Sequence, residues 1–262
     1  MGASKSMPVI DFSIVPFVQA SPELLYAEQI DNYRNKCNED KLNKISRRGQ
    51  LYSAYNYPTD YLLVLRETLN VALKHLPNRL NLQLQNVNII ILYPSADGGM
   101  PHTRPNDIIC FPYRADIPSL ETITHELWHI HQRKYPDFWQ LLLERAWQFK
   151  KWDGDLPAEL EKHRRLNPDT LATQNWIWQS KWVPVPVFID ASKPSLSECK
   201  IWYYNVITGR TEHGIPEEVY DFFGRRMESA AYEHPYEMAA YMLSKTTNEP
   251  TSAWNRIKYL QG

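Results

Sequence analysis

Two histidines and a glutamate have the clearest chemical meaning in this sequence. His125, Glu126 and His129 occur in the order H-E-x-x-H, within residues 117–133, whose apolar spacing predicts a helix. Histidines four positions apart lie on adjacent turns of one helix face, so both imidazoles can bind the same metal ion. Glu126 flanks that face, where a carboxylate can take a proton from a zinc-activated water. The pattern therefore predicts a catalytic zinc site with Glu126 as general base.

The residues around the motif support a helix. Apolar residues repeat at three- and four-residue spacings: Ile123, Leu127 and Ile130. Ser119, followed by Glu121, is typical of a helix start. His131 is about 160° from His129 around a helix, so it faces away from the metal and is excluded as a ligand.

A catalytic zinc site takes three protein ligands and keeps one position open. In the metzincin pattern a glycine and a third histidine follow the second histidine by three and six positions. Gln132 and Tyr135 stand there, which excludes that class. The third ligand must therefore come from another part of the chain.

The preferred third ligand is Glu237, far downstream. Pro235 can open a helix with Glu237 in its first turn. The small side chain of Ala240 would let this helix approach the H-E-x-x-H helix closely. Three other residues remain alternatives as third ligand: Glu233, His234 and, more remotely, Glu228.

With these two elements the chain resembles the gluzincins, zinc metallopeptidases in which a distal helix donates an acidic third ligand. The resemblance extends from about Ile89 to Leu243, but only the H-E-x-x-H residues and the Pro-x-Glu-x-x-Ala element carry it. It implies an α+β, zincin-like fold, with a small sheet packed on the active-site helix and a mainly helical remainder. It also implies one catalytic Zn²⁺, bound by His125, His129 and Glu237.

The function expected from this resemblance is hydrolysis of peptide bonds in a peptide or protein substrate. Zinc would polarise water and the scissile carbonyl, and Glu126 would pass the water proton to the leaving amine. One alternative is an inactive zincin-like protein that binds a partner, although Glu126 argues against a merely structural site. A second alternative is a zinc hydrolase of small amides or esters.

Two β-branched runs, residues 87–93 and 107–113, predict strands ahead of the motif. We expect Asp107–Pro112, including Ile109, to be an edge strand that pairs with an extended peptide. His102 and Arg104, in the intervening loop, are candidates for substrate contacts. Tyr241 is the preferred donor to the developing oxyanion, and three other residues are alternatives: Tyr236, His213 and Tyr204.

Other patterns outline the rest of the chain. Helices are expected over residues 21–37, 58–75, 138–151 and 216–231, and strands over 181–190 and 200–207. Pro184 and Pro186 predict that the first of these two strands is an edge strand. We expect an N-terminal helical segment, residues 1–80, followed by a catalytic domain, residues 81–262. A single continuous domain is the alternative.

Composition narrows the class of protein. The chain has 262 residues, 43% of them hydrophobic, which is enough for a large core. A net charge of −1 gives no long-range attraction to nucleic acid or anionic membranes. No apolar run approaches the roughly 20 residues of a transmembrane helix, and the three distant cysteines are typical of reduced thiols. We therefore expect a soluble, intracellular (cytoplasmic) protein with no transmembrane segment and no nucleic-acid partner.

The N-terminus raises one separate hypothesis. Residues 1–6 match the M-G-x-x-x-[ST] template for myristoylation at Gly2. An ordinary polar start or a tag remnant is the favoured interpretation. A single acyl chain would give only weak, reversible membrane contact.

Overall fold

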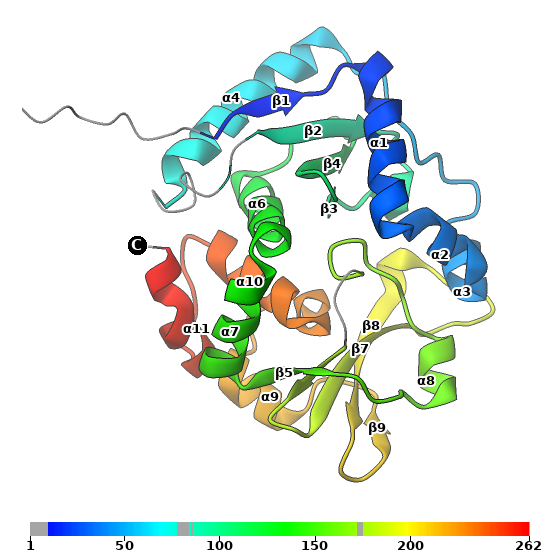
Figure 1. Ribbon diagram of the computed structural model, residues 1–262, viewed down its shortest axis with the longest axis vertical. Helices are drawn as coiled ribbons and strands as arrows, with labels where there is room; N and C mark the ends of the chain where they lie inside the picture. The colour runs from blue at the N-terminus through cyan, green and yellow to red at the C-terminus, as the bar shows by residue number, and fades with distance from the viewer. Residues whose placement is uncertain (1–9, 78–83, 85, 172–174, 262) are drawn as a thin grey trace, which may run out of the picture.

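The chain folds around two small β-sheets with helices between and around them, an α+β arrangement (Figure 1). The computed structural model describes residues 10–77, 84, 86–171 and 175–261. The candidate acylation site, Gly2, lies outside the described residues. In the described part, no helix is both long enough and apolar enough to cross a membrane.

The first sheet has the strand order β1-β2-β4-β3. It comprises β1 (Phe12–Ile14), β2 (Val87–Leu92), β3 (His102–Arg104) and β4 (Ile108–Pro112). β1, β2 and β4 are parallel, and β3 is antiparallel to β4. All residues of β4 and most of β2 are buried, as is usual for parallel strands covered on both faces.

The second sheet is an antiparallel meander in the order β5-β6-β7-β8-β9. Its strands are β5 (Phe149–Trp152), β6 (Asn175–Trp178), β7 (Trp182–Phe188), β8 (Cys199–Asn205) and β9 (Arg210–Glu212). Figure 1 shows this sheet at the far end of the molecule from the first sheet.

The helices lie between and outside the sheets. The α-helices are α1 (Phe17–Asp31), α2 (Tyr33–Glu39), α3 (Lys41–Ser46), α4 (Thr59–His75), α6 (Leu120–Lys134), α7 (Pro136–Trp147), α8 (Ala158–Lys162), α9 (Glu217–Phe223), α10 (Pro235–Ser244) and α11 (Ser252–Ile257). Short 3₁₀ helices are η1 (Ala96–Gly99), η2 (Leu196–Glu198), η3 (Ser229–Glu233) and η4 (Lys258–Leu260).

Helix α6 confirms the helix predicted over the H-E-x-x-H motif. The Ser119 hydroxyl caps it by accepting a hydrogen bond from the Thr122 amide. Its apolar side chains at 123, 127 and 130 are fully buried. α10 packs closely against α6, and Ala239 and Ala240 of α10 are fully buried. The two helices lie between the sheets (Figure 1).

Three predicted helices end earlier than expected, each at a residue with positive φ. Asn32 (φ 53°) separates α1 from α2, so the helix expected over 21–37 is broken. Gln148 (φ 62°) ends α7, and the residues after it form β5. Gly224 (φ 92°) ends α9, and a 3₁₀ helix follows only after a gap. A single residue with positive φ can end a helix even where the apolar spacing of the sequence continues beyond it.

The edge strand predicted for substrate pairing was wrong. β4 lies between β2 and β3, because residues 102–104, expected in a loop, form the edge strand themselves. Ile109 is fully buried and lies opposite Thr103 in the ladder. Its backbone is therefore not free to pair with a substrate, and Ile109 is removed from the candidate substrate-binding residues.

The edge position predicted for residues 181–190 was also wrong, since β7 lies between β6 and β8. Pro184 and Pro186 lie opposite Tyr203 and Ile201 of β8. The Pro186 carbonyl accepts a hydrogen bond from the Arg165 amide, so the polar backbone groups of Pro186 face away from β8. The missing N–H groups of the two prolines therefore do not interrupt the β7–β8 ladder.

The expected boundary near residue 80 does not separate two cores. β1 pairs with β2, and the Val15 amide donates to the Ile89 carbonyl. Leu65 and Leu69 of α4 belong to the same hydrophobic cluster as Ile123 and other residues of α6. The N-terminal segment therefore packs into the core that positions the H-E-x-x-H helix.

Candidate metal centre

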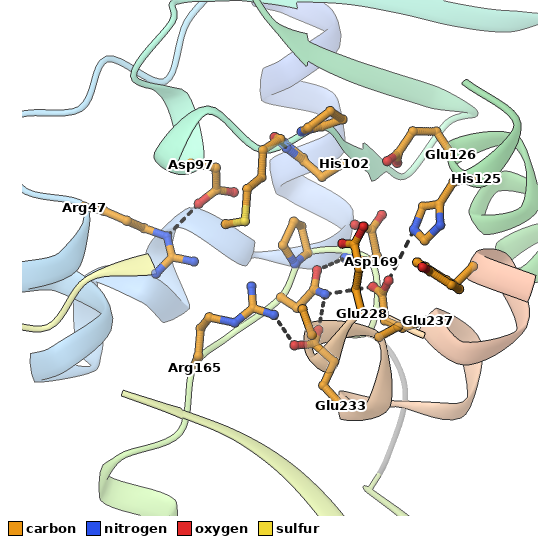
Figure 2. A pocket seen from close by; sticks show the side chains of 17 residues that line it. Arg47, Asp97, His102, His125, Glu126, Arg165, Asp169, Glu228, Glu233 and Glu237 are labelled. Atoms are coloured by element: carbon orange, nitrogen blue, oxygen red, sulfur yellow. Dashed lines mark hydrogen bonds and ion pairs between the residues drawn. The ribbon is translucent and has the colours of Figure 1, made fainter. Parts of the chain in front are cut away.

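Three side-chain atoms converge where α6 meets α10, and Figure 2 shows two of the three residues, His125 and Glu237. The Nε2 atoms of His125 and His129 are 2.9 Å apart, and each lies 3.3 Å from Oε2 of Glu237. Tetrahedral ligands about 2.0–2.1 Å from zinc would be separated by about 3.3 Å, so the spacing fits that ion. His125 and His129 are four residues apart on α6, and Glu237 is in the first turn of α10. The donor set and its spacing thus suit one Zn²⁺.

The electrostatics of the three groups also favour a cation. Burial lowers the pKa of His129, but Glu237, Asp169 and Glu126 together outweigh burial and raise that pKa to about 10. Burial raises the pKa of Glu237, but His129 and hydrogen bonds from both histidines hold it well below its usual range. The ionised carboxylate therefore favours positive charge at this point, whether carried by a proton or by a metal ion.

The alternative third ligands point elsewhere. Glu233 is buried in an ion pair with Arg165 and accepts a hydrogen bond from Asn167. The ring of His234 caps α10, where Nδ1 accepts from the Tyr236 amide. Glu228 is exposed and lies outside the metal-ligand group found among the described residues. The structure therefore groups Glu237, rather than its rivals, with the two histidines.

His131 faces away from the metal centre, as the helix geometry predicted. Its Nδ1 accepts a hydrogen bond from the indole of Trp139, 2.9 Å away. Burial, with a contribution from Lys134, lowers the pKa of His131 to about 4. This ring is a neutral part of the aromatic packing between α6 and α7.

Two residues that the sequence analysis did not select hold the predicted ligands in place. Nδ1 of His129 is 2.7 Å from Oε1 of Gln132, whose amide nitrogen donates to the Tyr236 carbonyl at 2.9 Å. An N–H at Nδ1 leaves the Nε2 lone pair free for a metal. Asn167 donates to Oε1 of Glu237 at 2.8 Å, which leaves Oε2 toward the histidines. Gln132 lies one turn from His129, a helical spacing that could have identified it.

Replacing Gln132 by Ala should weaken zinc binding by about 10- to 100-fold, the usual cost of losing an outer hydrogen bond to a ligand. Gln140→Ala is the matched control, because the Gln140 side chain on α7 bonds to Glu144 and does not line the cavity at the metal centre. Chelator competition followed by mass spectrometry measures both affinities. Equal affinity in the two variants would contradict a positioning role for Gln132.

Glu126 lies beside the converging atoms and is almost completely buried, with 4% of its surface exposed. Its Oε2 has no hydrogen-bond partner among the described residues. Burial, and next the negative charge of Asp169, raise the pKa of Glu126 well above its usual value. A buried carboxyl oxygen without a partner is uncommon unless it has a chemical role.

A cavity of about 280 Å³ opens in front of these residues. Its lining includes five side chains that Figure 2 labels: His102, His125, Glu126, Asp169 and Glu237. Tyr241 also lines it, one helical turn after Glu237. Besides His125, Glu126 and Glu237, two further predicted site residues, His102 and Tyr241, thus border the cavity.

Both ring nitrogens of His102 already have partners. Nδ1 lies 3.0 Å from the Met100 carbonyl and Nε2 lies 2.7 Å from the Tyr52 hydroxyl. His102 therefore forms part of the cavity wall, and its nitrogens are not available to a substrate.

The substrate contact predicted for Arg104 was wrong. Arg104 is fully buried and does not line the cavity at the metal centre. Its guanidinium forms ion pairs with Asp31 and Glu28 and donates to the Tyr52 hydroxyl. Arg104 thus joins α1 to the first sheet.

Arg104→Gln should lower the free energy of unfolding by about 3–5 kcal/mol, because it leaves the buried Asp31 carboxylate without its cation. Arg66→Gln, at an exposed position of α4, serves as the control and should change stability little. Urea unfolding followed by circular dichroism compares them. A loss below 1 kcal/mol in Arg104→Gln would show that this pair is not important for the fold.

Of the four candidates for an oxyanion donor, Tyr241 alone lines the cavity among the described residues. Tyr236 packs against Trp139 and Trp176. The other two candidates lie at the second sheet. Tyr204 of β8 packs on Trp152, and His213, directly after β9, stacks on Trp202.

No family model, curated protein or solved structure matches this chain. The geometry of the site is therefore the basis for its function.

Proposed function

We propose that this protein is a zinc-dependent hydrolase with a zincin-like catalytic centre, acting on peptide bonds. The observation that supports this most is the convergence of His125, His129 and Glu237 in the same site as Glu126. The Oε2 atom of Glu126 has no hydrogen-bond partner among the described residues. A structural zinc site usually closes its fourth position with protein, whereas three ligands next to a base suit catalysis.

The residues of the site divide into ligands, base and donor. His125, His129 and Glu237 would hold the zinc, which would supply a bound water of pKa about 7 and polarise a carbonyl oxygen. Glu126 accepts the proton as water adds to the carbonyl carbon, and returns it to the amine as the C–N bond breaks. The Tyr241 hydroxyl, which has no hydrogen-bond partner among the described residues, donates to the developing oxyanion.

One observation favours a second candidate, hydrolysis of small amides or esters. β3 is the edge strand beside the cavity, but the Thr103 amide donates to Asp169 and the Thr103 carbonyl accepts from Arg133. The N–H and C=O groups of Thr103 are therefore already hydrogen-bonded and are not free to pair with an extended peptide. The small cavity, about 280 Å³, suits a short substrate equally well.

A paired assay separates the two candidates. Metal content is first measured by mass spectrometry, and one zinc per chain is expected. The zinc-loaded protein is then given a library of internally quenched octapeptides and, separately, acetylated amino-acid amides and nitrophenyl esters. Chelator-sensitive cleavage of the peptides supports the peptidase, whereas cleavage of the small compounds alone supports the second candidate. Protein purified without chelator that contains and binds no zinc would contradict both.

A further inference from the structure

Arg34, in the first turn of α2, has a cationic side chain with no hydrogen-bond or ion-pair partner among the described residues. None of its side-chain nitrogens forms a hydrogen bond or ion pair within the described residues, and Nη1 is buried. By contrast, Arg47, Arg104 and Arg165 each form an ion pair with an aspartate or glutamate. Arg34 as a whole is half-buried, but a buried guanidinium N–H without an acceptor, such as that at Nη1, calls for an explanation such as a bound ion or ligand.

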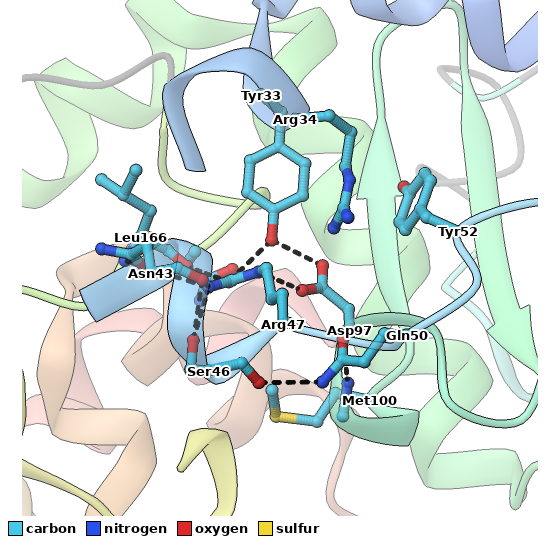
Figure 3. A network of polar contacts seen from close by, with 12 residues as sticks. Tyr33, Arg34, Asn43, Ser46, Arg47, Gln50, Tyr52, Asp97, Met100 and Leu166 are labelled. Carbon is cyan, nitrogen blue, oxygen red and sulfur yellow. Dashed lines mark hydrogen bonds and ion pairs between the residues drawn. The ribbon is translucent and has the colours of Figure 1, made fainter. Parts of the chain in front are cut away.

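Arg34 lines a cavity of about 500 Å³ on the α1 side of the first sheet. Its guanidinium carbon lies 4.6 Å from the centre of the Tyr52 ring, and Figure 3 shows the two side chains next to each other. Stacking on Tyr52 restricts the orientation of the guanidinium plane. The hydroxyls of Ser21 and Ser53 also line the cavity and have no partners among the described residues.

The charges around this cavity favour an anion. Glu28 is the acidic residue of its lining, and its carboxylate is engaged by the Arg104 guanidinium and by the backbone amides of Arg34 and Asn35. Arg104 lines the cavity as well. The charge of Arg104 is engaged by Asp31 and Glu28, so Arg34 is the cation of this lining that has no ion-pair partner among the described residues.

We propose that this cavity binds the phosphate group of a small molecule through Arg34. A guanidinium presents two parallel N–H groups that match phosphate oxygens, and the two serine hydroxyls offer further donors for the remaining oxygens. A volume of about 500 Å³ exceeds that of the phosphate ion, and Leu24 and Leu25 provide an apolar wall for an organic substituent. None of the three predicted zinc ligands lines this cavity, so the proposal does not depend on the metal centre.

Titration calorimetry with inorganic phosphate and with phenyl phosphate tests the site in the full-length protein. We expect one saturable site per chain and at least about tenfold weaker binding in Arg34→Gln, the effect of losing hydrogen bonds to a charged group. Arg48→Gln is the matched control, since Arg48 is an exposed neighbour with the same charge. Tighter binding of phenyl phosphate identifies an ester as the ligand, and equal binding identifies free phosphate. No saturable binding of either probe, or equal binding by Arg34→Gln and wild type, overturns the proposal.

Thermal unfolding separates a binding role from a structural one. Without phosphate, Arg34→Gln should unfold close to the wild-type temperature, because Arg34 is half-buried and forms no hydrogen bond or ion pair among the described residues. Phosphate at about 100 times its Kd should raise the wild-type Tm by about 5 °C or more and leave Arg34→Gln unchanged. A lower Tm of Arg34→Gln without phosphate, together with equal shifts in both proteins, would assign Arg34 a purely structural role.

Discussion

Glu126→Gln should retain one zinc per chain and lose hydrolytic activity by about 10²- to 10⁴-fold, the usual contribution of a general base. The substitution keeps the size of the side chain but removes its ability to accept the water proton. It also leaves all three proposed ligand atoms in place, because Glu126 is adjacent to His125 but not part of the ligand group. The turnover rate on the best substrate from the paired assay and the zinc content by mass spectrometry are measured together.

The matched control for this variant is Glu121→Gln. Glu121 lies on the same helix, but its side chain is partly exposed and pairs with Lys245. This variant should keep nearly full activity. Full activity in Glu126→Gln would refute the mechanism even if zinc is bound, whereas loss of both zinc and activity would assign Glu126 a role in holding the site together.

Glu237→Ala should lower zinc affinity by more than about 100-fold, beyond the cost of losing an outer-shell partner. The variant leaves two histidine ligands, and zinc sites in proteins rarely persist with only two protein ligands. It also removes the Glu237 oxygen that accepts a hydrogen bond from Asn167, and the carboxylate that favours a cation next to His129. Zinc affinity is measured by chelator competition in the wild type and the variant.

Glu228→Gln is the control, since Glu228 lines the same cavity but is exposed and lies outside the ligand group. It should bind zinc as tightly as the wild type. Equal zinc affinity in Glu237→Ala and the wild type would remove Glu237 from the site and reopen the choice of third ligand. Circular dichroism of each variant checks that a loss of zinc does not come from unfolding.

The sequence by itself determined the elements that depend on neighbouring residues. Apolar spacing and the Ser119 cap were sufficient to locate α6. Pro235 opens α10 and places Glu237 in its first turn, as predicted. These features arise from contacts within a few residues, so a linear pattern contains the information that specifies them.

Strand order and the partners of charged side chains were decided only by the tertiary structure. β4 is a continuous apolar run, as in any strand buried on both faces, and its interior position follows from the pairing of residues 102–104 beside it. Arg104 and Ile109 were misassigned for that reason. Linear patterns do not specify which distant strands become neighbours, because that depends on how the whole core packs.

The completion of the candidate metal centre is likewise a tertiary result. Glu237 lies more than 100 residues after His129, and the choice between it and Glu233 depends on Arg165, which neutralises Glu233. Asn167 comes from a third segment and orients the Glu237 carboxylate. The sequence thus determined which helices carry the chemical groups. The packing of α6 on α10 decided which of those groups meet, since distances between remote side chains are set only when the helices are in contact.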